Sequence, residues 1–342
     1  MDDWTMMSEP ADIASIDAPD AATYAREIVP RHRPVVMRGL VADWPIVAAG
    51  RTGPAAMASY LKAIDSGTPT TLFTAAPEVG GRFFYSGDMR GLNFKSHPIV
   101  LSDLLDRLVG LVGTPDPPSL YAGATPAAQS AAAFAKANPL PLPTPGGEPR
   151  IWIGNATQTA THYDGSHNVA CVVGGTRRFT LFPPEQVANL YIGPVDRTPA
   201  GQPVSMVDPL APDLDRYPRF AEAWRHAQHA ELKPGDALFI PSLWWHHVQS
   251  TEPLNVMVNY WYRNGPNTMP FAAMMHGVAA IRELPLAERS AWKAWFDHYV
   301  FSADAADATA HLPDHARGVL SPPSPGRDQM IKAYLMKVLS RL

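Results

Sequence analysis

Three side chains in the sequence could together hold a metal ion. His162 and Asp164 are two positions apart in a stretch of strand-forming residues, and alternate residues of a strand project to the same face. An imidazole and a carboxylate side by side can occupy one edge of a metal's coordination sphere. A third ligand must come from a distant strand, and the candidate is His246 in the segment PSLWWHH. Strand alternation predicts that only one of His246 and His247 faces inward.

Two histidines and one carboxylate on one face of an octahedron form the ligand set of non-haem iron(II) oxygenases. Three positions then stay open, two for a bidentate 2-oxo acid and one for O₂. A His-x-Asp pair also occurs by chance, and a solvated pair beside a turn is the ordinary alternative. The β-rich context and the polar residues within otherwise apolar strands favour the metal site. These polar residues are Thr159, Asn168, Arg177 and Asn259.

The segment that carries these residues consists of many short runs of strand-forming residues. From residue 151 onward, β-rich runs alternate with glycine and proline, and the 36 prolines of the chain are about twice the usual share. This pattern is typical of a β-barrel or β-sandwich. The runs are IWIGNATQTATHYD, NVACVVGG, RRFTLFPP, AELKPGD, ALFIPSLWW, HHVQS and NVMVNYWYR. The sequence KPGD predicts a turn, because proline presets φ and glycine supplies a positive φ.

The sequence before residue 151 is a mixture of helices, strands and loops. Apolar spacing predicts helices over 18–31, 53–65 and 98–112, with Ser102 and Asp103 capping the last of these. A short apolar run at 35–37 predicts a buried strand. The proline-rich segment 113–150 reads as loop with one helix near AQSAAAFAKA.

After residue 266 the pattern becomes helical. Two apolar stripes recur at helical spacing, within 285–301 and 327–342. Their members are Trp292, Trp295, Phe296 and Tyr299, and then Ile331, Leu335, Val338, Leu339 and Leu342. A stripe at this end of the sequence must be covered either by its own domain or by a second copy of the chain, which would give a homodimer.

The overall composition excludes several classes of protein. Lys+Arg number 28 against 32 Asp+Glu, a net charge of −4, so nucleic acid and anionic membranes are not expected partners. The single cysteine, Cys171, rules out an internal disulfide and a cysteine-based zinc cluster. We see no signal peptide and no apolar run long enough to span a bilayer, so a soluble cytoplasmic protein is expected.

The stretch 154–266 resembles the JmjC/cupin-like family of Fe(II)/2-oxoglutarate-dependent oxygenases. It is most similar to the branch that contains the asparaginyl hydroxylase of hypoxia-inducible factor and bacterial cupin-like (cupin_8) proteins. The segments that carry the resemblance are RPVVMRGLVADWP, GNATQTATHYD, RRFTLFPPEQVANLY, DPLAPDLDRYPRF, PGDALFIPSLWWHHV and VNYWYRNGP.

The resemblance implies a mostly β fold with flanking helices, built on a double-stranded β-helix (jelly-roll) core. It implies an oxygenase domain over 1–265, with the core at about 115–265 and N-terminal α/β support at 1–114. A C-terminal helical region, 266–342, would follow and could mediate dimerisation.

The resemblance also assigns roles to individual residues. His162, Asp164 and His246 would bind Fe(II), and His246 is preferred to His247 because the family's ligand directly follows the tryptophan pair. Arg177 falls where the hydroxylase has a lysine that pairs with the distal carboxylate of 2-oxoglutarate. A guanidinium can replace that lysine because it binds carboxylate bidentately. Arg178 should point outward, although a register error of one residue would exchange the two arginines.

Five further residues match family positions near the co-substrate. Thr159, Asn168 and Tyr121 would hydrogen-bond 2-oxoglutarate or order the site. Asn259 and Trp261 share a strand face, which the resemblance places in the cavity beside the metal. The ordinary alternative for all five is a satisfied polar or aromatic group inside a barrel.

The function implied is an Fe(II)-, 2-oxoglutarate- and O₂-dependent dioxygenase, most simply a hydroxylase of a protein or peptide side chain or of a small molecule. A cupin metalloenzyme that does not use 2-oxoglutarate is one alternative. A non-catalytic dimeric interaction module is the other. Dependence on the co-substrate separates the first alternative from the hydroxylase, and absence of oxo-acid decarboxylation would indicate the second.

Overall fold

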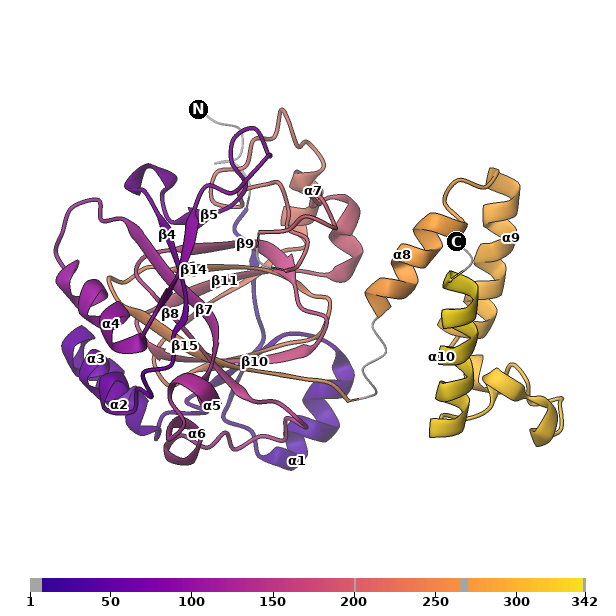
Figure 1. The fold of residues 1–342 in the computed structure, drawn as a ribbon, viewed down its shortest axis with the longest axis horizontal. Coiled ribbons are helices and arrows are strands. Elements are labelled where there is room, and N and C mark those ends of the chain that lie inside the picture. Colours follow the sequence, from indigo (N-terminus) through magenta and orange to yellow (C-terminus); the bar gives the residue numbers. More distant parts are fainter. Residues whose placement is uncertain (1–7, 200, 265–269, 341–342) are drawn as a thin grey trace. The chain divides into compact units, whose positions relative to one another are not determined.

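A computed structural model describes residues 8–199, 201–264 and 270–340, and the chain separates into two compact units, Met1–Gly265 and Pro266–Leu342. The first unit contains two mixed β-sheets that form a sandwich, as predicted (Figure 1). The six-stranded sheet has the order β1 (Ala11–Asp12), β12 (Gln228–Leu232), β11 (Arg177–Phe182), β14 (Trp245–Ser250), β9 (Gln158–Tyr163) and β5 (Arg82–Phe83). The nine-stranded sheet has the order β2 (Ser15–Asp17), β3 (Val35–Arg38), β13 (Ala237–Ile240), β10 (His167–Gly174), β15 (Asn255–Tyr262), β8 (Pro149–Gly154), β7 (Ser119–Pro126), β4 (Thr70–Ala75) and β6 (Lys95–Ile99).

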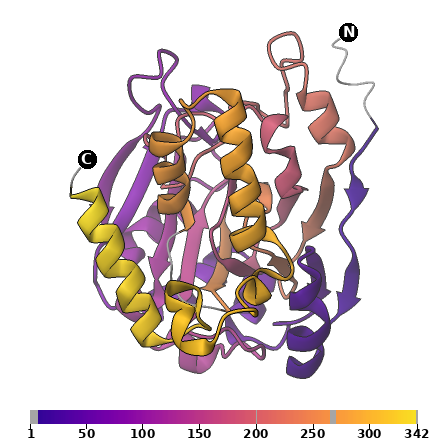
Figure 2. The ribbon, with the colours of Figure 1, turned by 90° about the vertical axis from the view of Figure 1, so that its right-hand side faces the viewer.

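The sandwich is not built from the region after residue 115 alone. Strands β1 to β6 all precede that residue and extend both sheets. Figure 2 shows the N-terminal strands running along one side of the sandwich, where β1 pairs with β12 and β2 pairs with β3, both in parallel. The segment 1–114 therefore completes the sheets that hold the site.

The central strands of the nine-stranded sheet, β10, β13 and β15, are buried on both faces, which explains their mostly apolar sequences. In β10, Val169, Cys171 and Val173 join the core cluster that includes the helices. The alternate residues Ala170 and Val172 join a second cluster that lies between the two sheets. A strand buried on both faces has no reason to alternate between apolar and polar residues.

Three helices cover the outer face of this sheet: α2 (Pro45–Thr52), α3 (Pro54–Ala63) and α4 (Leu101–Gly110) (Figure 1). Leu61, Leu104 and Leu108 are fully buried and belong to the same cluster as Val169. The helices α3 and α4 lie within the predicted ranges, whereas α2 was not predicted. It follows Trp44 with a proline at its first position, which is a recognised helix start.

The predicted cap of α4 is wrong. The helix begins at Leu101 after Val100, so Ser102 lies inside the first turn. Instead, the Asp65 carboxylate accepts hydrogen bonds from the Ser102 backbone N–H (2.8 Å) and hydroxyl (2.6 Å). A residue distant in sequence thus satisfies an unpaired amide at the helix start, the task that a local cap normally performs.

Other predictions for the first half of the chain hold with small changes. The helical segment expected at 18–31 runs from Ala21 to Arg31, as α1 (Ala21–Thr23) followed by π and 3₁₀ turns. The strand expected at 35–37 is β3. The single helix expected near AQSAAAFAKA is wrong, because two short helices, α5 (Ala127–Ser130) and α6 (Phe134–Ala137), occupy the segment.

The KPGD turn connects the two sheets, since β12 belongs to one and β13 to the other. Gly235 has a φ of +109°, a conformation that favours glycine. Its Asp236 carboxylate binds Arg38 (2.7 Å) and the backbone N–H of Gly39 (3.1 Å). The turn is therefore fastened to the end of β3.

The second unit consists of α8 (Pro270–Ala280), α9 (Leu286–Phe296) and α10 (Pro325–Leu339) with irregular turns between them. Both predicted apolar stripes are largely exposed within the described residues, for example Trp295 at 60% and Leu335 at 44%. Leu342 of the second stripe lies outside the described residues. Among the helices of the described residues, none has both the length and the apolar character needed to cross a membrane.

Candidate metal centre

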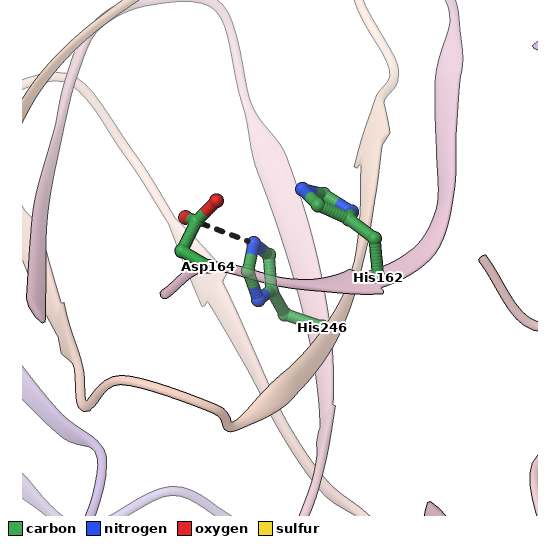
Figure 3. A group of neighbouring side chains, drawn as sticks. All are labelled: His162, Asp164 and His246. Atoms are coloured by element: carbon green, nitrogen blue, oxygen red, sulfur yellow. Dashed lines mark ion pairs between the residues drawn. The ribbon is translucent and has the colours of Figure 1, made fainter. Parts of the chain in front are cut away.

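The three predicted ligands converge at the inner face of the six-stranded sheet. His162 in β9 and His246 in β14 are directly opposite partners in the antiparallel ladder, and Asp164 follows β9 by one residue. Ligand atoms of all three side chains lie within 4.8 Å of one another. Figure 3 shows the side chains pointing toward one another, with 3.6 Å between Asp164 Oδ2 and His246 Nε2. The i, i+2 spacing and the cross-strand pair together create the cluster.

The hydrogen bonds of the two imidazoles determine which nitrogen can bind a metal. His162 Nδ1 lies 2.9 Å from the Ala160 carbonyl, and His246 Nδ1 lies 3.0 Å from the Trp244 carbonyl. A carbonyl only accepts, so each Nδ1 must carry the proton and donate. The Nε2 lone pairs are then free to face the Asp164 carboxylate. A partner of this kind on the other ring nitrogen is typical of metal-binding histidines.

Burial keeps the second histidine in its metal-binding form. His246 is only 3% exposed, and burial, followed by the charge of nearby His162, lowers its pKa, with Asp164 acting in the opposite direction. A histidine with a lowered pKa is neutral at physiological pH, and neutral imidazole is the metal-binding form.

His247, the other candidate in the pair, lies on the opposite face of β14. It is 1% exposed and is therefore buried rather than at the surface. Its Nε2 is 3.0 Å from Gln158 Oε1, and burial lowers its pKa to about 3. The choice of His246 as the residue that joins the cluster therefore agrees with the geometry.

A β-bulge in β9 lets Thr159 and His162 face the same cavity. Between the pairs His246–His162 and Val248–Thr159, β14 advances two residues while β9 advances three. Residues three apart in a regular strand would point to opposite faces. The extra residue in β9 reverses the alternation, and both side chains line one small cavity.

A chain of hydrogen bonds holds the Asp164 carboxylate in place. Asp164 Oδ2 accepts from Trp261 Nε1 (2.8 Å) and from Asn168 Nδ2 (3.0 Å). Asn168 Oδ1 in turn accepts from Asn259 Nδ2 (3.1 Å), and Asn259 Oδ1 accepts from Trp152 Nε1 (2.6 Å). An indole can only donate and a carboxylate can only accept, so the two ends of the chain fix the orientation of both amides.

Arg177 is buried in the same interior. It is 1% exposed, and among the described residues its Nε and Nη2 have no hydrogen-bond partner. Burial lowers its pKa, with Tyr121 acting in the opposite direction. Arg178 is exposed and pairs with Glu231 at 2.9 Å, so the prediction that Arg177 points inward and Arg178 outward is confirmed.

Arg177 and the three ligands line one cavity of about 30 Å³, together with Tyr121, Thr159 and Asn168. Burial raises the pKa of Tyr121, while Arg177 and Thr159 lower it in part, so its hydroxyl stays a donor. All nine predicted site residues therefore lie in or beside this interior. The cavity sits between the guanidinium and the ligand cluster.

Several aromatic residues of an adjoining cavity were not among the predicted site residues. This larger cavity, about 550 Å³, shares Tyr121, Thr159, His162, Asp164 and Trp261 with the small one. The missed residues are Phe73, Phe83, Phe94 and Trp152. Trp152 had a signal, because it alternates with the core residues Ile151 and Ile153 in β8 and must face the other side. The three phenylalanines come from segments far from the motif.

The residues fit the iron and co-substrate that the sequence resemblance implies. Two imidazoles and a carboxylate are the donor set of mononuclear iron(II) sites with open positions. The buried guanidinium with two unpaired nitrogens fits a carboxylate, because a buried charge without a partner is costly.

Comparisons with known proteins agree with this geometry. A family model described as a cupin-like domain matches residues 21–268. The chain is similar to "Lysine-specific demethylase JMJ31" of Arabidopsis thaliana, with 38% identity over 35% of this chain and 22% of that protein. It is similar to "tRNA wybutosine-synthesizing protein 5" of Mus musculus, with 35% identity over 39% of this chain and 40% of that protein.

A third relative is "Bifunctional peptidase and (3S)-lysyl hydroxylase JMJD7" of Homo sapiens, with 33% identity over 33% of this chain and 40% of that protein. The chain thus spans less than half the length of each of these relatives. The family model, in contrast, covers most of the sequence and every strand of both sheets except β1 and β2. The chain therefore belongs to the cupin-like, JmjC-related family.

Proposed function

We propose that this protein is an Fe(II)- and 2-oxoglutarate-dependent oxygenase that hydroxylates its substrate with O₂. The observation that carries the proposal is the convergence of His162, Asp164 and His246 within 4.8 Å at a cavity that also contains Arg177. Family membership supports the same activity, and its relatives include a protein named as a lysyl hydroxylase.

Each residue of the site would have a distinct task. His162 Nε2, His246 Nε2 and the Asp164 carboxylate would hold the iron. Bound Fe(II) supplies the activation of O₂ that is coupled to oxidative decarboxylation of 2-oxoglutarate. Arg177 would pair with the distal carboxylate of the oxo acid, and its fork geometry would fix the direction in which that molecule enters. The Tyr121 hydroxyl would donate to the same carboxylate.

The surrounding residues would preserve the geometry during turnover. Trp261 and Asn168 donate hydrogen bonds to Asp164 Oδ2, which fixes the orientation of the carboxylate that would hold the iron. These groups sit on strands, except Asp164, which directly follows β9, and ligands on rigid elements keep their positions better than ligands on loops. The aromatic lining of the larger cavity would limit the entry of water.

The substrate proposed at this level is a protein or peptide side chain or a small molecule. The names of the relatives do not agree on one substrate, since they point to a lysine demethylase, to tRNA wybutosine synthesis and to lysyl hydroxylation. The net charge of −4 offers no support for a nucleic acid.

The test is the iron-dependent release of succinate from 2-oxoglutarate by the purified full-length protein. We expect release with added Fe(II) and ascorbate, and its fall to the level of iron alone in His162→Ala and Asp164→Ala. His247→Gln is the matched control, because His247 lies on the opposite face of the strand that carries His246 and should leave turnover intact.

Each result that differs from this expectation would support a different conclusion. Full turnover in either ligand variant would contradict the iron site. Metal-dependent turnover of a substrate without 2-oxoglutarate would indicate another cupin metalloenzyme. Absence of decarboxylation under all of these conditions would favour the non-catalytic interaction module.

We also infer that the second unit mediates a homodimer. Its helices α9 and α10 expose large apolar side chains, including Trp292 at 47%, Trp295 at 60% and Leu339 at 49%. Apolar groups gathered in this number on one unit favour an interface. Light scattering after size exclusion should give a dimer for the wild type and a monomer for Trp295→Glu, with the exposed Lys332→Glu as control. A monomeric wild type would contradict the inference.

A further inference from the structure

The larger cavity beside the metal centre has a distinctive lining. It measures about 550 Å³ and reaches His162 and Asp164 at its inner end. Six aromatic side chains line it: Phe73, Phe83, Phe94, Tyr121, Trp152 and Trp261. This is the space next to the ligand cluster in which a substrate could lie.

The six rings form one continuous wall. Phe94 contacts Phe73 and Phe83 edge to face, with centroids 5.1 Å and 5.3 Å apart, and Phe83 stacks on Tyr121 at 5.8 Å. From Tyr121 the contacts continue through Trp152 to Trp261, whose indole binds Asp164. The wall therefore leads from the outer end of the cavity to the metal centre.

A glycine in β7 lets two of these rings pack closely. A Cβ at position 123 would lie 3.0 Å from the Trp152 ring and 3.1 Å from the Tyr121 ring. Such contacts are tighter than ordinary van der Waals packing, so the absence of a side chain at Gly123 helps to keep the wall in place.

Among the described residues, the cavity offers a cationic substrate group no counter-charge outside the metal centre, and its neutral polar side chains include Gln158, Thr159 and Gln202. Among the described residues that line it, Asp164 is the only one with a formal charge, and this carboxylate belongs to the metal centre. Burying an ammonium or guanidinium group without a counter-charge is strongly unfavourable. The lining thus disfavours a substrate whose reacting carbon lies beside a cationic end.

Aromatic rings can also bind cations through their faces, but here the faces are largely used by the protein. Phe83 and Tyr121 are stacked on each other. Arg150 lies 5.5 Å from the centroid of the Trp261 ring, where its positive charge would repel a second cation. The wall is therefore suited to van der Waals contact with a neutral group rather than to a cation cage.

We infer that the group hydroxylated at this site is uncharged and mainly apolar, an aliphatic or aromatic side chain or ring system, and not a lysine or arginine side chain. The inference rests on the proposed function and deepens it by naming the substrate class. It also separates this chain from the relative whose name states lysyl hydroxylation.

The test compares three probes that share a 3-phenylpropyl chain and carry a neutral, a small cationic or a bulky cationic group at one end. These are 3-phenylpropan-1-ol, 3-phenylpropylammonium and 3-phenylpropyl-trimethylammonium. Binding to the full-length protein loaded with Mn(II) and 2-oxoglutarate is measured by ligand-observed NMR under anaerobic conditions. We expect the alcohol to bind about tenfold or more tightly than either cation, because only the cations are buried without a partner.

Variants at the outer ring of the wall locate the binding. Phe94→Glu should weaken alcohol binding and tighten ammonium binding, whereas Phe94→Gln, of the same size but neutral, should not favour the cation. Phe301→Ala, an equally aromatic but 72% exposed position in the second unit, should change nothing. If the binding preference changes from the alcohol toward the ammonium only in Phe94→Glu, the probe binds in this cavity.

The outcomes are separable from those of the proposed function. Succinate release without substrate, measured on the same preparation, reports the oxygenase activity alone. Equal or tighter binding of either cation by the wild type would overturn the inference on the substrate, as would no binding of any probe or an unchanged preference in Phe94→Glu. None of these results depends on turnover.

Discussion

The two faces of the nine-stranded sheet are used in different ways, although the same strands supply both. On the helix-covered face, Val169 and Val258 belong to the large hydrophobic core cluster. On the face toward the six-stranded sheet, the same strands present Asn168 and Asn259, which hydrogen-bond to each other. A strand's period of two thus separates the residues that stabilise the fold from the residues that organise the site.

The comparison implies that the two faces should respond differently to substitution. Changes on the helix-covered face should lower stability and leave the chemistry of each folded molecule unchanged. Changes between the sheets should alter metal or co-substrate binding, with stability effects that depend on whether a polar partner is lost.

The largest effect is expected on the helix-covered face. Leu104 is fully buried in that cluster, so Leu104→Ala should lower the free energy of unfolding by about 3 kcal/mol through lost burial and a cavity. Urea titration measures the loss, and succinate release per folded molecule should stay at the wild-type value. Val112→Ala, at a position 44% exposed, serves as the control. A loss of turnover without a loss of stability would contradict a purely structural role for the helix-covered face.

Substitution of Arg177 should weaken co-substrate binding without lowering stability, which is the opposite of the pattern expected for Leu104. Arg177→Met removes a buried charge that lacks partners at two nitrogens, so the melting temperature should stay unchanged or rise. The KM for 2-oxoglutarate should increase about a hundredfold, because a charge-assisted carboxylate pair is lost. The KM of Arg177→Lys for 2-oxoglutarate should lie between that of the wild type and that of Arg177→Met. An unchanged KM in the methionine variant would remove Arg177 from co-substrate binding.

His247 extends the comparison to the outer face of the six-stranded sheet through pH. Its pKa is lowered to about 3 in the folded protein, whereas the unfolded chain binds this proton near pH 6.5. The unfolded state therefore binds more protons between these values, and stability falls as the pH drops below 6.5. The contribution is about 2 kcal/mol between pH 6.5 and pH 5.

His247→Gln should remove that part of the pH dependence, because glutamine can still donate to Gln158 but does not titrate. Urea midpoints of the metal-free protein at the two pH values provide the measurement. If the urea midpoint changes equally with pH in the variant and in the wild type, His247 is not the group that titrates.

The smallest effect is expected from the hydrogen-bond chain behind Asp164. Asn259→Ala removes the link between Trp152 and Asn168, and loss of such a support typically weakens metal binding about tenfold. Asn138→Ala is the matched control, because Asn138 is equally buried but binds Ile46 and Tyr60 on the helix side. Mn(II) titration should separate the two variants. Equal Mn(II) affinity of Asn259→Ala and Asn138→Ala would contradict the claim that one face of the sheet organises the site and the other stabilises the fold.

The ligand cluster was predictable from sequence because its causes are local and simple. The spacing of His162 and Asp164 places both on one side of the chain, and the family resemblance selects His246. The family resemblance likewise selects Arg177 as the arginine that points inward, and strand alternation then predicts that Arg178 points outward. The β-sandwich follows from the short apolar runs with their turn residues, which are themselves local signals.

Features that depend on tertiary contacts were not predictable. Asp65 caps α4 from 37 residues away, so the local Ser102 signal was misleading. Asn168, Asn259 and Trp261 were placed near the metal from sequence, but their binding to one another and to Asp164 depends on the register between strands. The aromatic wall was missed because its phenylalanines come from three segments that only the fold brings together.

The bulge in β9 has a consequence for how this segment can vary. Deleting one residue at Ala160 or Thr161 would restore regular pairing, and every residue on one side of the deletion would turn to the opposite face. Either Thr159 or His162 would then leave the interior, although no functional side chain had been replaced. The length of this strand is therefore as strongly constrained as its chemistry, and an alignment gap here would signal a non-functional relative.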